Sequence, residues 1–401
     1  MRYDKKNGIA AFAAQNGQVT NNVNAGQTQV DMVNNHFSMP RVLRASLSAE
    51  YTDDWGIKYS IEGIYTKTIK DVMFQQVNVK DNPSYYVYDT AAALRRQPIF
   101  PSGGVNSVFA NAYEMSNTTQ GSRFSITGKL SKEFSSGLGL MAAYTYGQSK
   151  DVSNGIRNSM ESNWQLNQSL NPNNPTAANS NFDIRNRIVA DVNYSLKWNK
   201  ANASKLTLFF SGQSGTPFTY GFVNYTVQND PQQVSLAYIP QRSEAVNFFA
   251  DAVKNGMVTE PAAQQANAFN NFIDANAYLR TRRGNFTERN AGRTPWNNQL
   301  DLRIEHNFSF STGGRSSGKT QQITFIWDVI NLTNLLDKRW GWVYFSPDTY
   351  NSTASVGLVP YIPARSSQGY PLYQFVDPGK PYSVDFFNSR WQMQAGIRYA
   401  F

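Results

Sequence analysis

Histidines and paired carboxylates are the first residues to weigh for catalysis or metal binding. His36 and His306 are the only two histidines and lie far apart in the sequence, although a metal site or a proton relay needs a second group nearby. Asp53 and Asp54 are adjacent, but neighbouring turn residues point in different directions and generally cap the turn. The chain has no cysteine, which excludes thiolate metal sites and cysteine nucleophiles. We therefore expect no enzyme activity, no metal site and no cofactor.

Aromatic rings offer a different chemistry, which is the stacking of a ligand. Trp340, Trp342 and Tyr344 lie within five residues of one another in a long polar region. Rings of this kind supply contact area at a low cost in side-chain entropy. An extended strand wall above a membrane would explain the same pattern. These three residues are the candidate ligand contacts.

Elements that would position such residues follow from the alternation of apolar and polar side chains. A strand flips its side chains at each residue and rises about 3.3 Å per residue, so ten or so residues give one apolar face as long as a tilted membrane crossing. Segment 390–401 alternates in this way without a break. Alternation predicts nine such segments, at 41–51, 56–67, 121–134, 137–149, 184–198, 203–213, 298–311, 320–331 and 390–401.

Connections between these segments are alternately short and long. Soluble half-buried sheets show the same alternation of side chains, but long connections are uncommon in compact soluble domains. Outer-membrane barrels combine short periplasmic turns with long extracellular loops. The sequence therefore predicts an all-β fold, an antiparallel transmembrane β-barrel in contact with outer-membrane lipids. The expected turns are 52–55, 135–136, 199–202 and 312–318, and the expected extracellular loops are 68–120, 150–183, 214–297 and 332–389.

Loop 214–297 is expected to contain a cap of short helices. Apolar residues recur at helical spacing between 243 and 255. A second helical stretch follows Pro261, with Phe269, Ile273 and Leu279 on one side. We expect this loop to be folded rather than flexible.

Charged residues occupy the polar face of the predicted strands, which in a barrel faces the lumen. Their role is either to contact a substrate during its passage or to solvate the lumen. The formal net charge of +9 is spread singly along the chain, which does not indicate nucleic-acid binding. The candidate lumen residues are Arg187, Asp191, Arg303, Glu305, Asp328 and Arg398.

The number of strands bears on whether the barrel is complete. Nine strands with the C-terminus on the short-turn side place 1–40 outside the cell, whereas a single-chain bacterial barrel has an even number of strands and closes without an edge. The start of the chain also shows no signal peptide. We expect 41–401 to be the C-terminal part of a larger barrel and 1–40 to be one of its extracellular loops.

Four short patterns stand at the ends of the predicted strands. They are FDIRNR at 182–187, RNAGRTPW at 289–296, WDVINLTN at 327–334 and YAF at 399–401. Taken in this order, they resemble the C-terminal barrel half of TonB-dependent outer-membrane transporters, especially the Oar-like, carboxypeptidase-regulatory-domain type of Bacteroidetes. Phe401, the last residue, resembles the assembly signal of such barrels.

The resemblance implies a barrel of about 22 strands around an N-terminal plug, with the plug and the remaining strands outside this sequence. The charged lumen residues would then hold the plug. It also implies nutrient capture and energised uptake through the TonB system. Two alternatives remain: a structural barrel that anchors an outer-membrane complex or a surface lipoprotein, and a passive porin.

Overall fold

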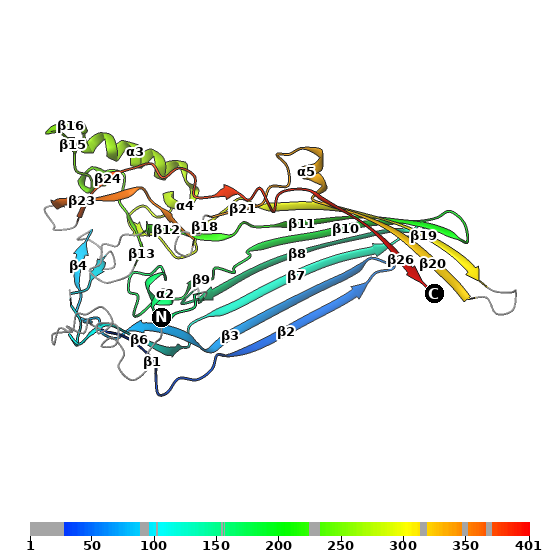
Figure 1. Cartoon of the computed structure of the whole chain (residues 1–401), viewed down its shortest axis with the longest axis horizontal. Helices are drawn as coiled ribbons and strands as arrows, with labels where there is room; N and C mark the ends of the chain where they lie inside the picture. Colours follow the sequence, from blue (N-terminus) through cyan, green and yellow to red (C-terminus); the bar gives the residue numbers. More distant parts are fainter. Residues whose placement is uncertain are drawn as a thin grey trace, which may run out of the picture.

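The computed structural model describes residues 28–88, 96–101, 103–153, 155, 157–223, 233–312, 319–346, 352–365 and 371–401. Of the predicted loop 1–40, residues 1–27 lie outside this description, as does most of the predicted turn 312–318. Long strands form one region of the molecule, and a group of short strands and helices gathers at one end of them (Figure 1). We call the first region the sheet and the second the loop module.

The sheet contains the strands that the alternation predicts, because each of the nine predicted segments overlaps a strand. Each of these nine strands pairs antiparallel with the next one along the chain. The strands are β2 (Arg41–Thr52), β3 (Lys58–Gln76), β7 (Ser122–Glu133), β8 (Leu138–Asp151), β10 (Asn186–Lys197), β11 (Asn202–Gln213), β19 (Asn297–Thr312), β20 (Lys319–Ile330) and β26 (Gln392–Ala400).

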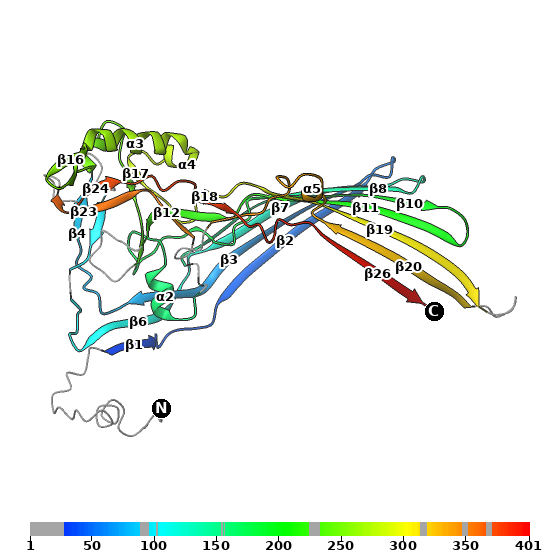
Figure 2. The ribbon, with the colours of Figure 1, turned by 45° about the horizontal axis from the view of Figure 1, so that its top comes forward.

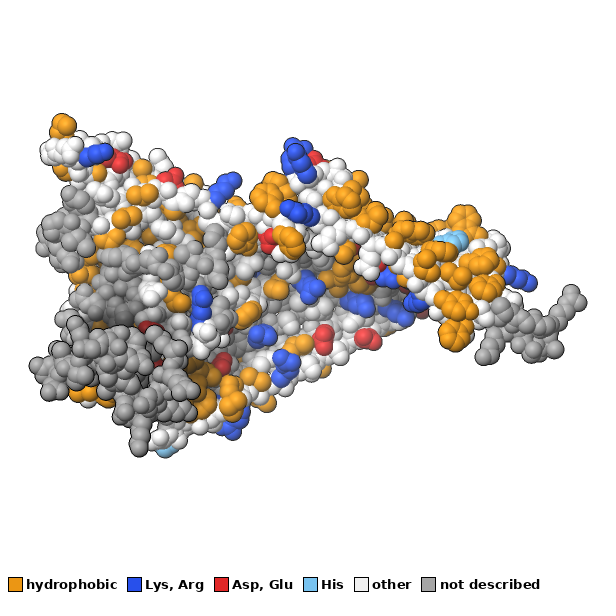
Figure 3. Space-filling model, viewed as in Figure 1, with side chains coloured by type: hydrophobic (Ala, Val, Ile, Leu, Met, Phe, Trp, Pro, Cys, Tyr) orange, Lys and Arg blue, Asp and Glu red, His pale blue; other side chains and the backbone are white. Residues whose placement is uncertain are grey.

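Register across the sheet separates polar from apolar side chains. Arg303 lies opposite Asp328, whereas its neighbour Ile304 lies opposite Trp327. On the other side of β19, Ile304 lies opposite Leu206. Acidic and basic side chains line the face of the sheet that Figure 3 shows. The register therefore gives the sheet one ionic and one apolar face.

The predicted end of the second strand, at 67, and the predicted extent of the loops 1–40 and 68–120 need correction. β3 continues to Gln76, well beyond the predicted end at 67, because its last part leaves β7 and pairs with β6 (Phe109–Thr118). β6 also pairs, in parallel, with β1 (Thr28–Val33). Parts of the predicted loops 1–40 and 68–120 are thus strands that extend the sheet towards the loop module.

The sheet is open along the described chain. β2 pairs with β3 and β26 pairs with β20, but no ladder among the described residues joins β2 to β26. Figure 2 shows these two strands in the turned view. A closed barrel is therefore not found, and the expected number of about 22 strands stays a prediction. No helix in the described part of the chain is long and apolar enough to cross a membrane.

The loop module combines helices with short strand pairs from several loops. Phe249 of one long loop forms a backbone bridge with Tyr373 of another. The helices are α2 (Met160–Gln165), η1 (Ala245–Phe248), α3 (Ala262–Ala275) and α4 (Ala277–Arg280). A further helix, α5 (Leu332–Leu336), lies apart from this module and packs beside β19 of the sheet (Figure 1). The strands are β4 (Ser84–Val87), β5 (Arg96–Ile99), β12 (Pro217–Val223), β13 (Val234–Leu236), β14 (Tyr238–Ile239), β15 (Ala252–Lys254), β16 (Met257–Glu260), β17 (Asn285–Phe286), β18 (Gly292–Arg293), β21 (Tyr344–Phe345), β22 (Thr353–Ser355), β23 (Leu358–Arg365), β24 (Pro371–Phe375) and β25 (Ser383–Val384). The short strand β9 (Ala178–Asn179) pairs with the end of β8 and belongs to the sheet.

The helix predictions in loop 214–297 had mixed outcomes. The second predicted stretch is α3 and α4, in which Phe269, Ile273 and Leu279 are fully buried. The first predicted stretch, 243–255, is helical only in η1. The prediction was wrong after η1, because β15 and β16 form a hairpin there. Asn255 and Gly256 both have positive φ at its turn, and an Asn-Gly pair strongly favours a tight hairpin turn.

The loop module has a hydrophobic core of its own. Phe269 on α3 packs against Phe249 and Phe375, with ring centroids 5.5 Å and 5.6 Å apart. Tyr238 and Phe248 stack at 5.9 Å in the same cluster. Buried residues from the loops 214–297 and 332–389 contribute to it together. These long loops therefore fold as one packed body.

Candidate ligand site in the loop module

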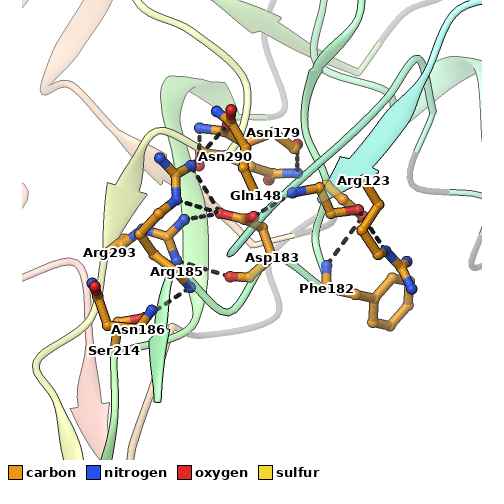
Figure 4. A network of polar contacts seen from close by, with 12 residues as sticks. Arg123, Gln148, Asn179, Phe182, Asp183, Arg185, Asn186, Ser214, Asn290 and Arg293 are labelled. Carbon is orange, nitrogen blue, oxygen red and sulfur yellow. Dashed lines mark hydrogen bonds and ion pairs between the residues drawn. The ribbon is translucent and has the colours of Figure 1, made fainter. Parts of the chain in front are cut away.

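A buried carboxylate joins the loop module to the sheet (Figure 4). Asp183 is 1% exposed and pairs with Arg185 at 3.0 Å and with Arg293. Its other oxygen accepts a hydrogen bond from the backbone N–H of Ser149, at the end of β8, at 2.6 Å. Arg293 also donates to the backbone oxygen of Asp183 at 2.9 Å. Because both carboxylate oxygens are occupied by donors, we interpret Asp183 as a structural group and not as a general base.

A second buried ion pair connects the same regions. Arg289 is 2% exposed and pairs with Asp151, the last residue of β8, at 2.6 Å. Burial lowers the pKa of Arg289, and the charge of Asp151 opposes that effect. Nearby, Asn290 donates to the backbone oxygen of Asn179 at 2.8 Å. Loops 150–183 and 214–297 are thus joined at the strand ends by charge-assisted hydrogen bonds.

Asn331 makes the corresponding connection after β20. It is fully buried and has a left-handed backbone conformation, with φ 55°. Its side-chain amide donates to the backbone oxygens of Gly341 and Ser389, each at 2.8 Å. Its backbone N–H donates to Asp301 on β19 at 2.8 Å. Loop 332–389 is therefore also anchored to the sheet at both of its ends.

An aromatic pocket of about 580 Å³ opens beneath α3 and α4. Phe218, Tyr220 and Tyr278 line it, and the two tyrosine rings stack at 6.0 Å. Burial raises the pKa of both tyrosines to about 12, so both hydroxyls are neutral at physiological pH. Lys380 also lines the pocket and adds a positive charge. The volume and the aromatic lining match those of small-molecule sites.

The predicted aromatic contacts are divided between two places. Tyr344 packs edge-on against Tyr382 at 5.8 Å, and Tyr382 lines the aromatic pocket. Trp342 packs edge-on against Tyr344 at 6.3 Å but lines a separate basic hollow of about 500 Å³ near α5. Trp340 is exposed. The structure thus brings Tyr344 next to the aromatic pocket and leaves Trp340 away from it, while a ligand role for any of the three stays a prediction.

The candidate lumen residues share one face, and several of them interact. Arg303 pairs with Glu305 at 3.2 Å and with Asp328 at 3.7 Å, and Arg398 approaches Glu305 at 4.0 Å. Asp191 on β10 accepts a hydrogen bond from Asn193. The register places Arg187 on the same face. Contact with a plug or a substrate stays a prediction for all six residues.

The remaining sequence candidates lie outside the loop module. Asp53 caps its turn as predicted, accepting from the backbone N–H groups of Trp55 and Ile57 at 3.0 and 2.8 Å. His306 shares a hydrogen bond with Ser204 at 2.9 Å on the apolar face. Phe401 is 87% exposed, and its role as an assembly signal stays a prediction.

The sequence analysis missed the residues that join the module to the sheet. Asp183, Arg289 and Arg293 stand in two of the four patterns quoted for the family resemblance, and Asn331 stands in a third. For Asp183 and Asn331 the available signal was their place at the ends of alternating segments, where a carboxylate or amide side chain can reach the adjoining loop. Arg289 and Arg293 lie nine and five residues before the segment at 298, so this signal does not extend to them.

Comparison with known families agrees with this architecture. The model of the outer membrane beta barrel domain family matches residues 3–360, and the chain belongs to that family. It is an integral outer-membrane β-barrel protein. Neither a curated protein nor a solved structure matches the chain.

Proposed function

We propose that this chain is the barrel part of a TonB-dependent outer-membrane receptor that captures a nutrient with its loop module. The observation that carries the proposal is the aromatic pocket of about 580 Å³ within a packed module. Residues of two long loops line this pocket, and the same two loops share one hydrophobic core. Uptake would then require an energised plug, supplied by protein outside this sequence.

Pre-organisation of the pocket supports a binding role. Tyr220 accepts a hydrogen bond from the Asn276 side chain at 2.6 Å, and Tyr278 accepts one from the backbone N–H of Glu288 at 2.7 Å. Both rings are therefore held in place before a ligand arrives. Binding to fixed side chains avoids the entropy cost of ordering them.

The test is uptake of labelled oligosaccharides, peptides and metal chelates by cells that make the full-length protein. Uptake that requires this protein and stops with a protonophore supports the proposal. A variant in which a Gly-Ser linker replaces 262–280 should remain in the membrane and lose uptake. Uptake that continues with a protonophore indicates a passive porin and contradicts the proposal. Absence of uptake, together with a co-purifying surface lipoprotein, indicates an anchor and also contradicts it.

A further inference from the structure

A hollow of about 660 Å³ lies on the apolar face of the sheet, far from the loop module. Small residues form its floor: Gly128 lies opposite Ile61 and Tyr144, and Ala142 lies opposite Leu130. The hollow exists because these two neighbouring strands carry almost no side-chain bulk at these positions.

The fold itself does not require the glycine at this position. Gly128 has no positive φ, and a Cβ added to it would meet nothing within 4 Å. Gly63 on the adjacent strand is equally unobstructed. Glycine within a strand is unfavourable by roughly 0.5–1 kcal/mol relative to alanine, and it often marks a place where a ligand approaches the backbone closely. The open space thus suggests an occupant outside the chain.

Hydrogen bonds fix the walls of the hollow. The Tyr59 hydroxyl donates to Asp53 at 3.1 Å, and the Tyr144 hydroxyl donates to Asn186 at 2.7 Å. Tyr51 packs against Tyr59 with ring centroids 6.2 Å apart. The polar end of Tyr59 and that of Tyr144 are therefore occupied, and their rings present apolar surface to the hollow.

A basic residue lies beside the hollow, towards the short turns. Lys132 is two residues beyond Leu130 on the same face, a step of about 7 Å along the strand. Its ammonium group lies 4.6 Å from the centre of the Phe134 ring. Lysines at the boundary of a membrane extend their charged ends towards lipid headgroups. An apolar hollow next to such a cation matches a lipid with a phosphate headgroup.

We infer that the hollow binds one acyl chain of a glycerophospholipid whose phosphate contacts Lys132. The lipid belongs to the leaflet at the short-turn end of the sheet. The apolar face lies against membrane hydrocarbon in an outer-membrane barrel, so an acyl chain reaches the hollow without crossing water. This site is independent of ligand capture by the loop module.

The first experiment measures phospholipid retained by the purified full chain in native mass spectrometry, after addition of palmitoyl-oleoyl phosphatidylglycerol. Ala142→Leu fills the hollow, and Ala395→Leu makes the same change elsewhere on the apolar face. We expect one retained phospholipid in the wild type and in Ala395→Leu. In Ala142→Leu retention should fall about tenfold, equivalent to about 1.4 kcal/mol. Equal retention in all three proteins would overturn the inference.

The second experiment locates the bound lipid by photocrosslinking and leaves the residues of the hollow unchanged. A phosphatidylglycerol with a diazirine in its acyl chain should crosslink the wild type within 128–144, and Lys132→Gln should reduce this labelling. Labelling spread evenly over the apolar face would contradict a site, as would retention of lipopolysaccharide in place of the phospholipid. A change of oligomeric state in Ala142→Leu would identify a second copy of the chain as the occupant and would likewise contradict the inference.

Discussion

The sheet and the loop module place their apolar side chains in opposite ways. In the sheet, Leu47 is 81% exposed and Ile397 is 73% exposed, whereas Phe269 in the loop module is 0% exposed. The module therefore shields its own apolar side chains from water, whereas the sheet depends on lipid to cover its apolar face. One chain thus combines a part that can be stable in water with a part that needs a membrane, and mutations should affect the two parts separately.

Removal of a core ring should have the largest effect, confined to the loop module. Phe269→Ala leaves a cavity in a closely packed cluster and should lower the free energy of local unfolding by about 3–5 kcal/mol. Native-state trypsin cleavage near Arg280 measures this change. Val246→Ala, at a half-exposed position, is the control. Equal cleavage of the two variants would mean that the module has no core of its own.

Loss of the buried carboxylate should separate the two regions. Asp183→Asn leaves Arg293 partly buried without its counter-charge, at a cost of about 3–5 kcal/mol. We expect faster proteolysis of loops 150–183 and 214–297 while the sheet stays inserted. The exposed Asp377→Asn serves as control. A second change, Arg293→Gln, should recover part of the loss, because paired residues are not additive. No recovery would argue against direct coupling.

A charge on the apolar face should affect the sheet and spare the module. Ile304→Arg, near the middle of β19, should destabilise membrane insertion by about 2–4 kcal/mol. Ser309→Arg places the same charge on the opposite face of the same strand and should have little effect. Urea titration of the chain refolded into vesicles compares them. Similar midpoints would show that the assignment of faces is wrong.

High pH should weaken the loop module, with the smallest of these four effects. The pKa values of Tyr220 and Tyr278 rise from 10.0 to about 12, so the folded state holds these protons more tightly than the unfolded state. Their contribution is complete below pH 10 and is lost as the pH rises through about 12. Absorbance at 295 nm, compared with Tyr220→Phe and Tyr278→Phe, follows this titration. Titration of both rings at pH 10 would contradict their burial.

The sequence was most informative where a local pattern determines the structure. Alternation located nine of the twelve described strands of the sheet, because side chains that face lipid and lumen must differ at every step. Helical periodicity located α3 but failed at 250–255, where the Asn255-Gly256 turn determines the backbone. The end of β3 was missed because pairing with β6 depends on residues more than 30 positions away.

Prediction of the candidate site was weaker for the same reason. The aromatic pocket combines Phe218, Tyr278 and Tyr382 from separate segments, and no local spacing reveals that they meet. Asp183, Arg289 and Arg293 were noticed as residues of short patterns, but the sequence did not indicate which residues they pair with. Asp183 finds Arg293 only after the chain has folded back on itself.

The ion pair between Asp183 and Arg293 also bears on the order of folding. Its partners are 110 residues apart in the chain, and contacts of such long range generally form late, because a large loop must close first. Between them lie β10 and β11, which must cross the membrane. We therefore expect the loop module to close only after these strands are in place, so that insertion precedes completion of the aromatic pocket.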